Sequence, residues 1–333
     1  MKKIYICHTE YHVLITLIKN INNSKEKNDI VLYGTLKNVN KVYKKIKETD
    51  LFDNVYIFNY RDTEEVEKIP ETKNVILRRI RLKKWIKEKY NFDFLKNKEV
   101  YIFNDNSLIG MFLRLSKINY NIIEDGYDCY KHIERHYDFN GIKYKIKILI
   151  NDITNSFGTS KYVKQIEVNS LEGINLSFKN KFIEKPRKEI FDKLDNKQKK
   201  IIIDVFLDKP LDLSNKEVSL LITQPLYKDG FLDNEERQIK MYKYMLETYI
   251  QGDIIIKPHP RDETNYLKVI KDCIVLNSDF PIEILNLMDG IHIKKCITAF
   301  STSVDFITRC DEKIVLGSEW VKKYKNGEIN GKK

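Results

Sequence analysis

One histidine stands between two prolines in the run Lys257-Pro258-His259-Pro260-Arg261, which follows the apolar triplet Ile254-Ile255-Ile256. Each proline fixes its own φ and biases the preceding residue towards extended backbone, so a stiff loop after a strand presents the imidazole. The flanking Lys257 and Arg261 favour an anionic ligand, and a protonated imidazole could neutralise or protonate a leaving phosphate. The same prolines would also end an ordinary strand, so this run alone leaves both interpretations open.

Hydroxyl and carboxyl side chains that suit a nucleotide follow further along the chain. Ser301-Thr302-Ser303 precedes a predicted helix over Val304–Arg309, where hydroxyls, backbone N–H groups and the helix dipole favour a phosphate. Glu283 follows Pro281 at the start of another predicted helix, and its carboxylate could accept both hydroxyls of a ribose. An ordinary helix cap and an exposed helix acid are the alternatives. Together with His259, these residues indicate a nucleotide-activated donor.

Two adjacent acids, Glu124 and Asp125, precede Gly126 at the end of the apolar run Tyr120–Ile123. Their mutual repulsion is expected to raise the pKa of one carboxyl towards the range of a general base, and the glycine to allow a sharp turn. A solvated turn at a strand end is the alternative. The triplet therefore supplies a candidate base without being a specific motif.

The sequence lacks the motifs that would indicate a metal or a triphosphate site. We find no Asp-x-Asp pair after a predicted strand, no His/Cys cluster at ligand spacing and no P-loop. We therefore expect chemistry without bound Mg²⁺ or another cofactor. In that case His259, Lys257 and the hydroxyls of Ser301 and Ser303 would stabilise the leaving phosphate.

All of these candidates stand where predicted strands end. Apolar strands alternate with helical stretches, as in a doubly wound parallel sheet. The predicted strands are Lys3–Cys7, Asp29–Gly34, Asn54–Asn59, Glu99–Phe103, Tyr120–Ile123, Val218–Ile222, Ile254–Ile256, Cys273–Leu276, Lys295–Thr298 and Lys313–Leu316. Helices predicted in the second half include Glu235–Tyr249, Asp262–Ile270 and Ile282–Met288. The pattern predicts two Rossmann-like α/β domains with parallel sheets facing a central cleft, although no GxGxxG for conventional dinucleotide binding follows the first strand.

Between these two halves the periodicity weakens. Gly141–Ile150 alternates lysine with apolar residues, which suits a lysine-protected edge strand better than a membrane surface. Lys197–Lys216 is charged at both ends and contains Pro210, as a linker would. Domains are therefore predicted at 1–200 and 201–333.

The composition is that of a globular protein with anionic partners. Of the 333 residues, 42% are hydrophobic and 32% charged, and the net charge of +11 favours nucleotides, nucleic acid or an anionic membrane face. Five cysteines without CxxC spacing argue against disulfides or zinc and favour a reducing cytoplasm. The N-terminal apolar run is too short for a signal peptide, and none approaches a membrane span. We expect a cytoplasmic protein, soluble or peripheral on the inner face of the membrane.

Three motifs, in this order, resemble those of bacterial sialyltransferases: Glu124-Asp125-Gly126, His259-Pro260 and Ser301-Thr302-Ser303. Two further stretches, Ile6-Cys7-His8-Thr9 and Thr223-Gln224-Pro225-Leu226, look most like the lipooligosaccharide sialyltransferases of glycosyltransferase family 52. The resemblance extends over both halves of the chain. It implies a GT-B type, metal-independent, inverting enzyme that uses CMP-sialic acid.

The resemblance also implies roles for individual residues at the donor. His259 would be the acid or the phosphate partner. The other donor contacts implied are Lys257 and Pro260 along the cytidine, Glu283 on the ribose, and Ser301, Thr302 and Ser303 at the phosphate.

The general base and the acceptor contacts are less closely defined by the resemblance. Related families take the base from the acid-acid-Gly turn, here Glu124 or Asp125, whereas the loop after the first strand of the second domain supplies Asp229 as the other candidate. Family members often carry Thr-Pro-Leu-Gln after the first strand. This chain has Thr9-Glu10-Tyr11-His12 instead, so acceptor-side contacts of Thr9 and His12 are expected to differ.

The sequence thus predicts a sialyltransferase, or an enzyme for a related nine-carbon acid, that modifies a terminal galactose of a surface glycan such as lipooligosaccharide or capsule. Its partners would be CMP-sialic acid, a galactose-terminated glycan and the inner membrane face, with a homodimer as one option. A GT-B transferase for another nucleotide sugar, such as UDP-glucose, is the nearest alternative. A basic nucleic-acid-binding protein and an inactive sugar-binding relative are the others. Lysines interleaved with acids and the lack of an RNP, KH or zinc pattern argue against nucleic acid.

Overall fold

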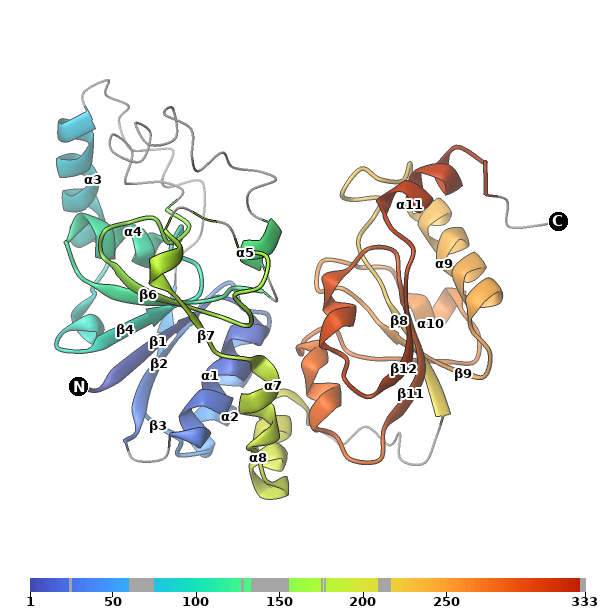
Figure 1. The fold of residues 1–333 in the computed structure, drawn as a ribbon, viewed down its shortest axis with the longest axis horizontal. Helices are drawn as coiled ribbons and strands as arrows, with labels where there is room; N and C mark the ends of the chain where they lie inside the picture. The colour runs from blue at the N-terminus through green and yellow to red at the C-terminus, as the bar shows by residue number, and fades with distance from the viewer. Residues whose placement is uncertain are drawn as a thin grey trace. The chain divides into compact units, whose positions relative to one another are not determined.

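The computed structural model describes residues 1–23, 26–59, 75–126, 129–132, 156–174, 176, 178–208 and 217–329. The chain forms two compact units, Met1–Val205 and Phe206–Lys333, each with its own parallel sheet (Figure 1). The helix α8 (Asn196–Phe206) runs through the predicted domain boundary at 200/201. The predicted edge strand or membrane surface at Gly141–Ile150 lies outside the described residues.

The first unit is built on a seven-stranded parallel sheet in the order β3-β2-β1-β4-β5-β6-β7. Its strands are β1 (Lys3–Cys7), β2 (Asn28–Tyr33), β3 (Phe52–Phe58), β4 (Glu99–Ile102), β5 (Tyr120–Ile123), β6 (Val163–Val168) and β7 (Phe182–Glu184). Its helices are α1 (Glu10–Asn22), α2 (Val39–Glu48), α3 (Val75–Lys89), α4 (Leu108–Leu115), α5 (Cys129–His132) and α7 (Arg187–Asp192), with short 3₁₀ turns at Asp93–Leu95 and Lys179–Lys181. The chain winds outwards from β1 to β3 and returns beside β1 with β4, and such a reversal is where open α/β sheets bind ligands.

The core of this unit explains its sequence pattern. Strand β2 is buried at every position, as parallel strands covered on both faces are, so it is mostly apolar. Its buried Asp29 pairs with Lys2 at 2.6 Å and with Lys98, which offsets the desolvation of the carboxylate. Helix α1 is buried over most of its length because it packs on the sheet and beside α7 (Figure 1).

The second unit has a five-stranded parallel sheet in the order β10-β9-β8-β11-β12. Its strands are β8 (Glu217–Ile222), β9 (Asp253–Lys257), β10 (Cys273–Val275), β11 (His292–Thr298) and β12 (Cys310–Val315). Its helices are α9 (Glu235–Tyr249), α10 (Tyr266–Val269) and α11 (Ser318–Lys325), with 3₁₀ helices η4 (Ile282–Leu287) and η5 (Thr302–Phe306). The reversal here lies between β8 and β11, so the loops after these strands and after β9 form the candidate ligand edge.

Three helices predicted for this unit are wrong in length or type. The helix expected over Asp262–Ile270 is confined to Tyr266–Val269, and those expected over Ile282–Met288 and Val304–Arg309 are the 3₁₀ helices η4 and η5. Short connecting segments favour 3₁₀ turns because few residues are available to form α-helical hydrogen bonds. In the first unit, β6, β7 and α7 were not predicted, because they lie where the alternation of apolar and polar residues weakens.

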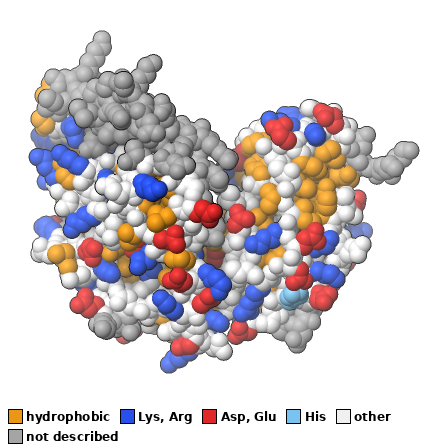
Figure 2. Space-filling model, in the orientation of Figure 1, with side chains coloured by type: hydrophobic (Ala, Val, Ile, Leu, Met, Phe, Trp, Pro, Cys, Tyr) orange, Lys and Arg blue, Asp and Glu red, His pale blue; other side chains and the backbone are white. Residues whose placement is uncertain are grey.

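Charged side chains are mixed rather than segregated on the face shown in Figure 2, where Lys and Arg are interleaved with Asp and Glu over both units. Many are joined along helices at i,i+4 spacing, for example Lys188 with Asp192 and Lys200 with Asp204. Among the described residues, no helix is both long and apolar enough to cross a membrane.

Candidate functional site

Three loops of the second unit meet at the edge where its sheet reverses. Gln224, after β8, accepts a hydrogen bond at Oε1 from the backbone N–H of Phe300, after β11, at 3.0 Å. Thr223 Oγ1 accepts one from the backbone N–H of His259, after β9, at 3.3 Å. The loops that carry His259 and Ser301 are therefore both tied to the end of the central strand β8. The structure brings the predicted histidine and serines to one edge of one sheet.

Asp262 anchors the His259 loop. Its buried carboxylate accepts hydrogen bonds from Thr223 Oγ1 and Tyr266 Oη, both at 2.6 Å, and from the Thr264 backbone N–H at 3.2 Å. Its own backbone N–H donates to the carbonyl of His259 at 2.9 Å. Because a buried carboxylate with several donors is held in one position, the loop geometry does not depend on its prolines alone. The sequence pattern placed Asp262 in a helix and did not indicate that it anchors the loop. The hydroxyl residues Thr223 and Tyr266, which donate to it, were the signal that could have indicated this.

His259 is half-buried, and its tautomer is set by the loop. Nδ1 accepts a hydrogen bond from the Arg261 backbone N–H at 3.1 Å, so the proton of the neutral ring lies on Nε2. Burial, followed by the positive charge of Arg261, lowers the pKa of His259 below its ordinary value. The lowered pKa favours the neutral ring in this environment, and a protonated imidazole stays a prediction for the state with a phosphate bound. A phosphate placed at Nε2 would raise the pKa again.

Asp229 is joined to the histidine loop by an arginine. The Arg261 guanidinium donates to both carboxylate oxygens, at 2.8 and 3.1 Å, and this pairing lowers the pKa of Asp229. Arg261 therefore positions His259 with its backbone and Asp229 with its side chain. A second link between the same two loops is the ion pair of Lys228 and Glu263 at 2.7 Å. The structure thus brings one candidate base next to the candidate acid.

The hydroxyl segment forms a tighter structure than predicted. Ser301 is the N-cap of the five-residue η5, and its Oγ accepts a hydrogen bond from the Ser303 backbone N–H at 3.3 Å. Thr302 is exposed, while Ser301 and Ser303 are half-buried. The α-helix predicted after these hydroxyls is wrong, since η5 is a short 3₁₀ turn, and the phosphate-binding role of the segment stays a prediction. The Ser301 and Ser303 hydroxyls can still donate hydrogen bonds to an anion.

A buried cation and a buried acid lie beneath the same edge. Lys257 ends β9 with its ammonium 4.6 Å from the centroid of the Phe280 ring, a cation–π contact. Glu283, in the first turn of η4, is buried rather than exposed, and burial raises its pKa to about 7 although the charge of Lys257 acts in the opposite direction. Glu283 therefore titrates near neutral pH. Pro260, by contrast, is exposed beside His259.

In the first unit, His12 and Asp125 form a pair between α1 and the end of β5. His12 Nδ1 accepts the His8 backbone N–H at 3.0 Å, and Nε2 donates to Asp125 Oδ1 at 2.5 Å. The imidazole is fully buried and stacks on Phe103 with ring centroids 4.1 Å apart. Thr9 is exposed as the N-cap of α1 and accepts the His12 backbone N–H at 3.3 Å. The two predicted acceptor-side residues thus orient Asp125 and the start of α1.

The two acids of the Glu124-Asp125-Gly126 turn have separate surroundings. Glu124 is buried and accepts the Asn169 backbone N–H at 2.8 Å, whereas the Asp125 side chain is 43% exposed. Burial acts to raise the pKa of Asp125, but the interaction with His12 outweighs it and the pKa is lowered. The rise in pKa predicted for one of the two acids does not occur at Asp125, and for Glu124 it stays a prediction. A Cβ at Gly126 would meet nothing within 4 Å and its φ is ordinary, so the turn does not need a glycine.

The predicted site residues thus form two groups, one in each unit. The first holds Thr9, His12, Glu124 and Asp125, and the second holds Asp229, Lys257, His259, Pro260, Glu283, Ser301, Thr302 and Ser303. Among the described residues, no group of three or more His, Cys, Asp or Glu side chains is arranged to hold a metal ion. His8, Phe103, Thr223, Gln224 and Asp262 are the positioning residues that sequence reasoning did not assign.

Comparison with known proteins gives a family and a fold. The model of glycosyltransferase family 52 matches residues 74–316 of the chain. A protein of Haemophilus influenzae, described only as uncharacterized, is 28% identical over 211 residues, which are 63% of this chain and 66% of that protein. The match therefore spans just under two thirds of that relative's length.

Solved structures of low sequence identity share the fold. An alpha/beta-galactoside alpha-2,3-sialyltransferase of Photobacterium phosphoreum has a TM-score of 0.57 and 16% identity, covering 99% of this chain and 96% of that one. The GT-B domain of a Photobacterium damselae sialyltransferase has a TM-score of 0.53 and 12% identity, covering 92% and 89%. A UDP-GlcNAc 2-epimerase of Methanocaldococcus jannaschii has a TM-score of 0.52 and 15% identity, covering 100% and 94%. The prediction of a GT-B type fold with two Rossmann-like domains is confirmed.

Proposed function

The chain belongs to glycosyltransferase family 52, and from that membership we propose that it is an inverting sialyltransferase that transfers sialic acid from CMP-sialic acid to a terminal galactose of a surface glycan. The observation that carries the proposal is the loop cluster of the second unit, where a neutral His259 offers Nε2–H beside the ionised Asp229. Two proteins of similar fold are named sialyltransferases, which supports this choice of donor.

The donor would bind along the edge formed by the loops after β8, β9 and β11. Lys257 and Pro260 would lie along the cytidine, and Glu283 would accept the ribose hydroxyls once it is ionised. Thr302 and the hydroxyls of its neighbours would bind the phosphate. In these assignments the leaving phosphate is stabilised by hydrogen-bond donors of the protein. We therefore expect activity to persist when divalent metal ions are chelated.

In the reaction, the galactose hydroxyl loses its proton to a carboxylate while its oxygen bonds to the anomeric carbon of sialic acid. The bond from that carbon to the CMP oxygen breaks, and the electron pair leaves with the phosphate. His259 Nε2–H donates a hydrogen bond to this leaving oxygen and so stabilises its negative charge. Attack from the face opposite the leaving group inverts the anomeric centre.

Asp229 is our choice for the general base. It lies in the same loop cluster as His259, because Arg261 contacts both residues, and its lowered pKa keeps it in the ionised form that a general base requires. Asp125 is the alternative, as an ionised carboxylate oriented by His12. We assign Asp125 to positioning of the acceptor hydroxyl.

A panel of nucleotide sugars tests the proposal directly. We expect CMP release from CMP-sialic acid, accelerated by a galactoside, and no comparable turnover of UDP-glucose or UDP-GlcNAc. The UDP sugars belong in the panel because a similar fold occurs in a UDP-GlcNAc epimerase. No CMP release with or without a galactoside would overturn the sialyltransferase assignment, and turnover of a UDP sugar would replace it with another GT-B activity.

We also propose that the protein binds peripherally to the inner face of the membrane. The net charge of +11 favours a peripheral position at the inner leaflet, near a lipid-linked acceptor. Retention of activity with a soluble galactoside would show that the membrane supplies only the acceptor.

A further inference from the structure

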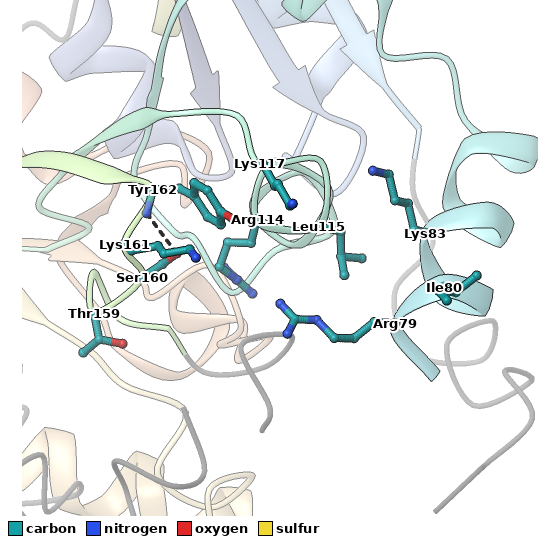
Figure 3. Close-up of a pocket in the computed structure, with 10 residues that line it drawn as sticks. All are labelled: Arg79, Ile80, Lys83, Arg114, Leu115, Lys117, Thr159, Ser160, Lys161 and Tyr162. Carbon is teal, nitrogen blue, oxygen red and sulfur yellow. Dashed lines mark hydrogen bonds between the residues drawn. The ribbon is translucent and has the colours of Figure 1, made fainter. Parts of the chain in front are cut away.

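The first unit contains a basic cavity that the proposed reaction does not use. It has a volume of about 500 Å³ and lies among α3, the end of α4 and the loop before β6 (Figure 3). Its size is in the range of small-ligand sites. It adjoins the amino ends of β5 and β6, whereas Asp125 follows the carboxyl end of β5. The cavity is therefore at the opposite edge of the sheet from the Asp125 turn.

The described lining of this cavity carries five cationic side chains and no acidic one. They are Arg79 and Lys83 from α3, Arg114 from α4, Lys117, and Lys161. Figure 3 shows the guanidinium groups of Arg79 and Arg114 directed towards one another, with Lys161 beside Arg114. The Arg114 side chain is fully buried, donates from Nη1 to the carbonyl of Asp105, and lies 3.8 Å from Asp105 Oδ2, so its charge is offset by Asp105. Lys83, Lys117 and Lys161 leave the described part of the lining with a net positive charge.

The wall of the cavity formed by Thr159–Tyr162 is held in place by buried contacts. Lys181 donates from Nζ to the carbonyls of Gly158, Thr159 and Ser160, the last at 2.7 Å. Asp105 Oδ2 accepts the backbone N–H of Gly158 at 3.2 Å. The loop that carries Lys161 is therefore held in place, and a ligand would meet little cost of ordering it.

The rest of the lining is apolar and aromatic, from Ile80, Leu115 and Tyr162. An anionic group next to a sugar ring or a glycerol backbone matches this combination, since basic side chains bind phosphate through charge-assisted hydrogen bonds and rings pack on apolar surface. We propose that this cavity binds the phosphate ester of a phosphorylated sugar or of a phospholipid headgroup. Such a site would hold the phosphate-bearing part of a glycolipid acceptor, or the membrane itself, at the first unit.

The test compares two charge-reversal variants of the same helix. Arg79→Glu/Lys83→Glu changes the cavity, and Arg81→Glu/Lys84→Glu makes the same change in charge at exposed positions of α3 that do not line it. Pyrophosphate binding, measured by calorimetry on the full chain, should weaken at least about ten-fold in the cavity variant and little in the control, because charge-assisted hydrogen bonds are lost. Equal affinities in the two variants, or no binding by the unchanged protein, would overturn the proposal.

A second measurement distinguishes the two sources of the phosphate. We would compare sedimentation with phosphatidylcholine vesicles that do or do not contain phosphatidylglycerol. Loss of the phosphatidylglycerol-dependent binding in the cavity variant alone would assign the site to a lipid headgroup. Unchanged vesicle binding together with lost pyrophosphate binding would assign it to a phosphorylated sugar. Turnover with an unphosphorylated galactoside should be equal in both variants. Because this assay does not depend on the cavity, absence of turnover would contradict the proposed function and not the cavity proposal.

Discussion

The two units each contain a histidine that is held in the same way but surrounded differently. His12 and His259 both accept a backbone N–H at Nδ1, so both carry the ring proton on Nε2. His12 is fully buried and donates that proton to Asp125, whereas His259 is half-buried and no described residue accepts from its Nε2. The same constraint on the tautomer therefore orients a carboxylate in the first unit and presents a hydrogen-bond donor in the second. A catalytic role is expected for the second histidine and a positioning role for the first.

The largest effect is expected from His259→Ala. Loss of the donor to the leaving phosphate should lower kcat by about 10²–10⁴-fold, the range for positioned acid–base groups, and change CMP affinity much less. Steady-state kinetics and CMP titration measure the two quantities. His292→Ala is the matched control, because His292 is exposed and pairs with Asp311 at 2.9 Å away from the loop cluster. Equal losses in turnover and in CMP binding would contradict a catalytic role.

The next largest effect separates the two candidate bases. Asp229→Asn should lower kcat by about 10²-fold or more, since the amide cannot accept the proton of the galactose hydroxyl. Asp125→Asn should raise the KM for the galactoside with a smaller change in kcat, because we assign it to acceptor positioning. Both variants keep the shape of the side chain. A collapse of kcat in Asp125→Asn, with Asp229→Asn nearly unchanged, would transfer the role of base to the first unit.

Parts of the fold could be predicted from the sequence where they depend on interactions between residues close together in the chain. Strands such as Tyr120–Ile123 can be recognised because their burial on both faces requires a mostly apolar run, here interrupted only by Asn121. Since side chains after parallel strands gather at one edge, the grouping of His259 with Ser301 also followed from strand order. The short strand Phe182–Glu184 was not predicted, because it lies at the edge of the sheet and its three residues show little apolar pattern.

The surroundings of the site residues could not be predicted, because they depend on contacts between distant segments. His12 contacts Asp125 across 113 positions of the chain, and this contact lowers the pKa of Asp125. Asp262 binds Thr223 across 39 positions, which no local pattern records. Residue types near strand ends therefore identify the candidates, and the fold shows which of them hold others in place.

The pairing of His12 with Asp125 should be visible in stability. In a double-mutant cycle with His12→Gln and Asp125→Asn, we expect a coupling of about 1–3 kcal/mol in the free energy of unfolding, because a buried imidazole loses its charged partner. Urea unfolding of the four proteins measures it. Additive single changes would show that the 2.5 Å contact contributes little.

Glu283 provides a pH-dependent test in the second unit. Its pKa is raised from 4.5 to about 7 in the folded chain. The unfolded carboxyl releases its proton first as the pH rises, so this group lowers stability progressively between those two values, by up to about 3 kcal/mol at a pH above both. Glu283→Gln should therefore be increasingly stabilising relative to the unchanged protein from about pH 5 to about pH 8.

The same titration should appear in donor binding. If the ionised carboxylate accepts both ribose hydroxyls, CMP affinity should rise up to about ten-fold between about pH 6 and pH 8 in the unchanged protein and remain flat in Glu283→Gln. Calorimetric titration of CMP provides the measurement. An identical pH profile in both proteins would place the ribose away from Glu283.

The smallest effect is expected at the glycine of the acid-acid-Gly turn. An added Cβ at Gly126 would meet nothing within 4 Å, so Gly126→Ala should change the free energy of unfolding by no more than about 0.5 kcal/mol. Gly110→Ala is the contrasting variant in the same unit, because its Cβ would lie 2.6 Å from the carbonyl carbon of Asp105 and force a backbone shift. Thermal melts and galactoside kinetics of both variants test this. A loss of turnover without a loss of stability in Gly126→Ala would mean that the acceptor closely approaches the backbone at this turn, and that the first unit contributes more to the reaction than the orientation of Asp125.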